Sequence, residues 1–158
     1  MSTKTREPES ESETVAKSKV PTRPPGLKVL DKLVGRWKIS GGSEGEVTYE
    51  WTDGGFFLFQ RGEVKRDEGT YKYRGFIGYE HSPGAEPAKV ITSRLYTSTG
   101  DTLDYTSEVD DKGMTIWFGP KGSPSAYKGE WSDDGNTLRG EWQWPGGGYK
   151  ETMTRQKG

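Results

Sequence analysis

The chain has 158 residues, with 23 Lys and Arg, 24 Asp and Glu and a formal net charge of -1. Both signs of charge are interspersed, so the sequence predicts neither a nucleic-acid surface nor binding to an anionic membrane. The chain has no cysteine, which excludes disulfides and thiolate chemistry. Because no signal-peptide core or bilayer-spanning apolar run is found, we expect a cytoplasmic protein, as a monomer or a weak homodimer.

The first segment, residues 1–23, is rich in Ser, Thr, Lys and Glu and has no aromatic residue. Such a segment cannot bury enough apolar surface to offset the entropy of ordering. The sequence therefore predicts a disordered tail over residues 1–23 and one folded domain over residues 24–158.

A short helix of about two turns is expected after Pro24-Pro25-Gly26. Apolar residues there share one face at helical spacing, namely Leu27, Leu30, Leu33 and Val34. The helix would lie across one end of the domain, either as a fixed plug or as a mobile lid over a ligand.

From Trp37 to Gln156 the chain is a series of about ten short, aromatic-rich alternating segments bounded by turns. Helical periodicity is almost absent. The pattern predicts an all-β domain, a single antiparallel up-and-down barrel of about ten strands.

The hairpin around residues 132–136 has one register that separates charge from aromatic residues. It pairs Glu130 with Arg139 and Lys128 with Glu141 on one face. The other face carries Tyr127, Trp131, Leu138 and Trp142, with Gly129 opposite Gly140. A slip of one residue would invert both faces, so we expect the aromatic face inside. The paired glycines would either leave room for a ligand or let the strands bend.

The next hairpin, with Trp144 near Tyr149, continues the interior face. It then runs through Trp142, Trp144, Tyr149, Glu151, Met153 and Arg155. Glu151 is therefore an inward-facing acid, which is costly unless it is paired or hydrogen-bonded. Arg155 is only an indirect partner, because four strand residues separate the two by about 13 Å.

Earlier strands are assigned in the same way. The turn at residues 110–113 pairs Val109 with Met114, Ser107 with Ile116 and Tyr105 with Phe118. The inward residues are then Leu103, Tyr105 and Phe118, together with Tyr71, Tyr73, Ile77 and Tyr79 from the segment 71–79. Residues 90–97 allow two registers, one with Arg94 and Tyr96 inward and one with Ile91, Ser93 and Leu95 inward. We favour inward Arg94.

The Gly35-x-Trp37 motif, the strands after it and an arginine on the last strand resemble the calycin superfamily of lipocalins, fatty-acid-binding proteins and nitrobindin-like barrels. An ordered set of motifs is similar to a bacterial family of unknown function numbered 1579, over about residues 27–156. These motifs are Asp53-Gly54-Gly55-Phe56-Phe57-Leu58, Gly78-Tyr79, Thr102-Leu103-Asp104-Tyr105, Gly122-Ser123-Pro124, Asp133-Asp134-Gly135-Asn136-Thr137-Leu138 and Met153-Thr154-Arg155.

The resemblance implies a lipocalin-like barrel in which Trp37 closes one end and Arg155 packs across its ring, a structural role for Gly35, Trp37 and Arg155. Nitrobindin-like barrels hold haem through a histidine near the C-terminus. This chain has only His81, in a Pro/Gly loop, so we expect no haem and no other cofactor. Paired aspartates are turn residues, and no metal site is expected.

The leading interpretation is a protein that binds a small apolar or aromatic molecule, one that can carry an anionic group, inside the barrel. The expected lining residues are Tyr73, Arg94, Tyr105, Tyr127, Trp142, Trp144, Tyr149 and Glu151, with Arg94 as the anion's partner. The aromatics could instead fill the interior. An alternative is a lipocalin-like cyclase or isomerase of a natural-product-type metabolite, with Glu151 as its acid. A third is an interaction module whose tail recruits partners.

Overall fold

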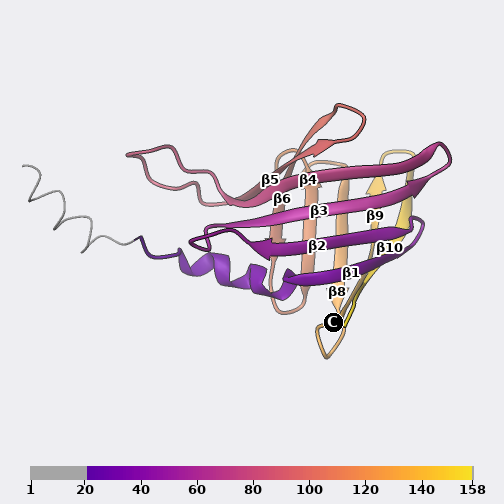
Figure 1. The fold of residues 1–158 in the computed structure, drawn as a ribbon, viewed down its shortest axis with the longest axis horizontal. Coiled ribbons are helices and arrows are strands. Elements are labelled where there is room, and N and C mark those ends of the chain that lie inside the picture. The colour runs from indigo at the N-terminus through magenta and orange to yellow at the C-terminus, as the bar shows by residue number, and fades with distance from the viewer. Residues whose placement is uncertain (1–20, 158) are drawn as a thin grey trace, which may run out of the picture.

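The computed structural model describes residues 21–157, which form one closed antiparallel barrel of ten strands. Each strand pairs with its neighbours in sequence, and β1 closes the barrel against β10 (Figure 1). The strands are β1 Gly35–Gly41, β2 Gly45–Trp51, β3 Phe57–Arg66, β4 Gly69–Tyr79, β5 Ile91–Thr97, β6 Thr102–Val109, β7 Gly113–Phe118, β8 Ala126–Trp131, β9 Thr137–Trp144 and β10 Gly147–Arg155. The up-and-down barrel expected from the alternating pattern is confirmed.

The tail predicted over residues 1–23 lies outside the described residues as far as residue 20. Its last residue, Arg23, is described and makes defined contacts. The Arg23 guanidinium lies 4.4 Å from the centroid of the Trp51 ring and 3.9 Å from the Asp31 carboxylate. Arg23 therefore packs against the barrel domain.

The expected helix is present as the 3-10 helix η2, Pro25–Leu33. Its buried residues Leu27, Leu30 and Leu33 are spaced by three, which places them on one face because a 3-10 helix has three residues per turn. Each is at most 1% exposed, so in this structure the helix plugs one end of the barrel.

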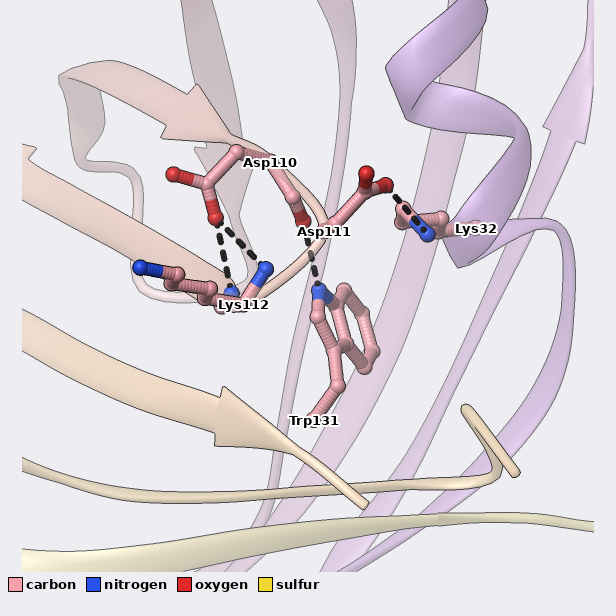
Figure 2. Close-up of polar contacts among 6 residues, drawn as sticks. Lys32, Asp110, Asp111, Lys112 and Trp131 are labelled. Atoms are coloured by element: carbon pink, nitrogen blue, oxygen red, sulfur yellow. Dashed lines mark hydrogen bonds and ion pairs between the residues drawn. The ribbon is translucent and has the colours of Figure 1, made fainter. Parts of the chain in front are cut away.

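Polar contacts tie the turn between β6 and β7 to η2 and to β8. Lys32 forms an ion pair with Asp111 at 3.3 Å, and the Trp131 indole N–H donates to the Asp110 carbonyl oxygen at 3.1 Å (Figure 2). The Asp110 carboxylate accepts hydrogen bonds from the backbone N–H groups of Lys112 and Gly113. These bonds to its ionised form lower the pKa of Asp110.

Trp37 and Arg155 close this end as the resemblance implies. The Arg155 guanidinium lies 4.2 Å from the centroid of the Trp37 ring and donates to the carbonyl oxygens of Val34 and Lys32. Gly35 has φ +128, and a Cβ there would approach the Arg155 Nη1 atom to 2.9 Å. Glycine at position 35 therefore serves both the backbone turn and the close approach of the arginine.

The predicted strand registers can be compared pair by pair with the barrel. The pairs of the hairpin between β8 and β9, from Trp131 with Leu138 to Tyr127 with Trp142, are confirmed, as are those between β6 and β7. The β9–β10 hairpin keeps its predicted interior face, but Trp144 pairs with Gly147, two positions before Tyr149. The turn is therefore only Pro145-Gly146, with Gly146 at φ +90 as a type II turn requires.

No helix within residues 21–157 is long and apolar enough to cross a membrane.

Candidate functional site

The interior of the barrel beyond the plug holds a cavity of about 580 Å³. Seven of the residues predicted from the sequence line it, namely Tyr73, Tyr105, Tyr127, Trp142, Trp144, Tyr149 and Glu151. The alternative of a completely filled interior is therefore wrong. A volume of this size is typical of sites for small molecules.

Arg94 is the one predicted lining residue that faces the other way. It lies on the outer face of β5, where its guanidinium forms an ion pair with Asp104 of β6 at 2.8 Å. Ser93 and Leu95 line the cavity instead. The favoured register of residues 90–97 was wrong, because Arg94 and Asp104 are opposite each other and gain more by pairing in water than by burial.

Several lining residues were not singled out from the sequence as ligand contacts. They include Tyr49, Gln60, Tyr71, Ser93, Ser107 and Met114. Tyr71 had been placed inside from the segment 71–79, and Ser107 and Met114 share the face of Tyr105 by the same alternation, so part of the signal was present. What the pattern did not supply was which inward positions border open space.

The open end, or mouth, of the cavity carries Ser43, Lys65, Arg66, Trp144 and Tyr149. Trp144 and Tyr149 stack edge to face with their ring centroids 5.9 Å apart and are 41% and 37% exposed. The Arg66 guanidinium lies 4.1 Å from the centroid of the Tyr71 ring. The mouth therefore combines aromatic rings with two solvent-accessible cations.

Glu151 is the acid in this cavity wall. Burial raises the pKa of its carboxyl group to about 7. Among residues 21–157, no side chain forms a hydrogen bond or an ion pair with the Glu151 carboxylate, and the distant Arg155 is engaged at the closed end. Its neighbours across the sheet are Gly41 on β1 and Gly140 on β9, so no side chain flanks it there.

Tyrosine side chains surround this acid. Burial, with added repulsion from the Glu151 charge, raises the pKa of Tyr105 and of Tyr149 to about 12 and those of Tyr49 and Tyr127 still higher. These phenols therefore stay neutral at physiological pH. They offer ring faces to whatever occupies the cavity, and Tyr49, Tyr105 and Tyr149 also offer O–H donors.

Two glycines, Gly62 on β3 and Gly129 on β8, give up their space to tyrosine rings. A Cβ at Gly129 would lie 2.7 Å from the Tyr127 hydroxyl oxygen, and a Cβ at Gly62 would meet the ring of Tyr73. These two positions therefore seat aromatic side chains in the wall. At Gly140, the other glycine predicted inside, a Cβ would meet the backbone of Lys128 and Gly129, so this glycine allows β8 to approach closely, in line with the interpretation that the strands bend here.

Metal and haem ligands can be assessed over the described part of the chain. Residues 21–157 contain no group of three or more His, Cys, Asp and Glu residues placed to hold a metal ion. His81 is not among the cavity residues, and its Nε2 atom lies 2.6 Å from the carbonyl oxygen of Ala85 in the same loop.

Comparisons with known proteins give no match: neither a protein-family model nor a curated protein matches this chain.

Proposed function

We propose that this protein binds a small apolar or aromatic molecule inside its barrel. The observation that carries the proposal is the cavity of about 580 Å³, which is hollow, lined with aromatic side chains and closed at one end by η2. Apolar walls supply affinity, and a few convergent polar groups supply orientation. Because one chain forms the whole cavity, a second subunit is not needed.

From the sequence, Arg94 was expected to hold an anionic group of the ligand. This expectation loses its main support, because Arg94 faces outward. The remaining cations are Lys65 and Arg66 at the mouth. Both are solvent-exposed, so salt screens their attraction for a ligand. An anion inside the cavity would lie near Glu151 with no cation beside it.

Native mass spectrometry of the gently purified protein tests the proposal first, since excess mass that vanishes on denaturation identifies a bound molecule.

Titration with the neutral dye N-phenyl-1-naphthylamine tests the proposal without the natural ligand. We expect the dye to become fluorescent when it binds in the cavity. The variant Ser125→Trp narrows the cavity and should therefore weaken the binding of the dye. Lys128→Trp, on the outer face of β8, is the matched control. Absence of both excess mass and dye binding would contradict the proposal.

A second candidate is catalysis, as a cyclase or an isomerase of an unsaturated, natural-product-type metabolite. It is favoured by the raised pKa of Glu151, about 7, because a general acid or base works best when its pKa is near the ambient pH. Neutral tyrosine hydroxyls would assist proton transfer. If Glu151→Gln abolishes turnover and leaves ligand binding intact, the enzyme is supported.

We also propose kinship with the lipocalin-like barrels and with family 1579. The support is the ordered set of motifs together with the stacking of Arg155 on Trp37 at 4.2 Å. Solved structures of that family with the same stacking and an inward acid at the position of Glu151 would strengthen this assignment, and their absence would weaken it.

A further inference from the structure

The charges in the cavity are unevenly placed. Glu151 lies half-buried in the wall, whereas Lys65 and Arg66, the cations that line the cavity, are exposed at its mouth. Within residues 21–157 the Glu151 carboxylate has no cationic partner. Even a half-buried carboxylate without a partner loses part of its hydration, so a ligand that supplies a positive charge would offset that loss.

No side chain flanks Glu151 from the strands on either side of it. Its cross-strand neighbours Gly41 and Gly140 have no side chains, and the Tyr127 ring, which covers Gly129, donates its hydroxyl hydrogen bond to the backbone carbonyl oxygen of Glu151 at 3.1 Å. The Tyr127 hydroxyl is therefore already used, and the carboxylate itself stays open to the cavity.

Aromatic rings complete the surroundings. Tyr127 and Tyr105 both pack on Trp142, with ring centroids 5.7 Å and 6.2 Å from it. Tyr49 and Tyr73 face the same space from β2 and β4. Aromatic faces attract cations through their quadrupoles, and a ring of them beside a carboxylate is the arrangement that recognises quaternary ammonium groups.

We propose that the cavity selects molecules in which a quaternary or protonated amine is attached to an apolar or aromatic body, with the ammonium group against Glu151. This inference rests on the proposed function and names its ligand class. The body of the ligand would lie among the apolar residues Leu95, Leu103 and Ile116, which line the same cavity.

The ionisable groups that face Glu151 come from several strands. They are Tyr49 of β2, Tyr73 of β4, Tyr105 of β6, Tyr127 of β8 and Tyr149 of β10. All are tyrosines whose pKa is raised, so they do not ionise between pH 6 and pH 8. Lys65 and Arg66 of β3 lie at the mouth, where solvent screens their charges.

The test compares two molecules of nearly the same shape, phenyltrimethylammonium and the neutral tert-butylbenzene, in competition with bound N-phenyl-1-naphthylamine. We expect the wild-type protein to bind the cation about tenfold more tightly than the neutral molecule. In Glu151→Gln this preference should disappear. Glu130→Gln, an exposed acid on the outer face of β8, is the matched control and should keep it.

A second measurement does not depend on any variant. Phenyltrimethylammonium has a permanent charge, so its affinity for the wild-type protein should rise about tenfold from pH 6 to pH 8 as Glu151 ionises, while that of tert-butylbenzene stays constant. A flat profile for the cation, or tighter binding of tert-butylbenzene or of the anion 4-tert-butylbenzoate, would overturn the inference and leave the proposed function standing. If neither the dye nor any of the three competitors binds, both this inference and the proposed function are overturned.

Discussion

The Tyr127 hydroxyl donates a hydrogen bond to the backbone carbonyl oxygen of Glu151 at 3.1 Å. Tyr127 lies on β8 and Glu151 on β10, so this bond crosses β9 at Gly140, which pairs with both Gly129 and Glu151. Gly140 also lets the two strands lie close together, because a Cβ there would meet the backbone of Lys128 and Gly129. The bond fixes the Tyr127 ring in the cavity wall and holds the strand that carries the acid.

Tyr127→Phe removes this hydrogen bond and keeps the ring. We expect it to lower the free energy of unfolding by about 0.5–1.5 kcal/mol, the usual net contribution of one hydrogen bond. Urea denaturation followed by tryptophan fluorescence measures the change. Tyr71→Phe is the control, because it keeps the ring under Arg66 and no hydrogen bond of its hydroxyl is found in the described residues. Equal effects of the two variants would contradict the role of the bond.

The pKa of Glu151 makes stability depend on pH. Its carboxyl group has a pKa of about 7 in the folded protein against 4.5 as the ordinary value, so between these pH values the folded state holds a proton that the unfolded state has lost. The contribution of Glu151 to stability must then fall as the pH rises from about 4.5 to about 7, by up to about 3 kcal/mol, and stay level above that range.

The variant Glu151→Gln isolates this effect. Because glutamine does not ionise, the difference in unfolding free energy between variant and wild type should grow in favour of the variant from pH 4.5 to pH 7. Denaturant titrations at a series of pH values measure it, and the difference cancels the contributions of other groups such as Asp110 and Asp134. A difference that is constant with pH would show that Glu151 titrates normally.

The outward position of Arg94 predicts that it takes no part in ligand binding. Arg94→Ala should leave the affinity for N-phenyl-1-naphthylamine unchanged, since its partner Asp104 also lies outside. Trp142→Leu removes an aromatic side chain from the cavity wall and should lower the affinity for the dye by about tenfold. Weaker dye binding in Arg94→Ala would indicate that the outer face contributes to the site.

The sequence predicted registers best where charge and hydrophobicity agreed. On β8 and β9, Glu130 with Arg139 and Lys128 with Glu141 fix the same register as Tyr127 with Trp142. On β5 the charge pattern and the hydrophobic pattern disagreed. Leu95 faces inward and Tyr96, which is 56% exposed, faces outward, so apolar residues occur on both faces and the alternation is ambiguous. Only the pair Arg94 and Asp104 could have decided it.

Other features depend on three-dimensional quantities that a sequence pattern does not contain. The glycine run after Pro145 suggested a longer turn, but Gly147 and Gly148 belong to β10, because a Pro-Gly pair alone completes the turn. The free volume beside Glu151 depends on the barrel's diameter and on the side-chain rotamers, which place the Tyr127 ring over Gly129.

The contact between Gly62 of β3 and Tyr73 of β4 gives a prediction with its own internal control. The two residues are cross-strand partners, and a methyl group at position 62 would meet the Tyr73 ring. Gly62→Ala should therefore destabilise the protein by about 1–3 kcal/mol and push the ring into the cavity, which weakens the binding of N-phenyl-1-naphthylamine.

In a Tyr73→Leu background the ring is gone, so the same Gly62→Ala change should cost much less. We expect the double-mutant cycle to give an interaction energy of about 1 kcal/mol or more, measured by urea denaturation of the four proteins. Additive effects would show that the glycine does not seat the ring. In that case the conformation of Tyr73, and with it the shape of the cavity between β2 and β4, would have to be set by other contacts.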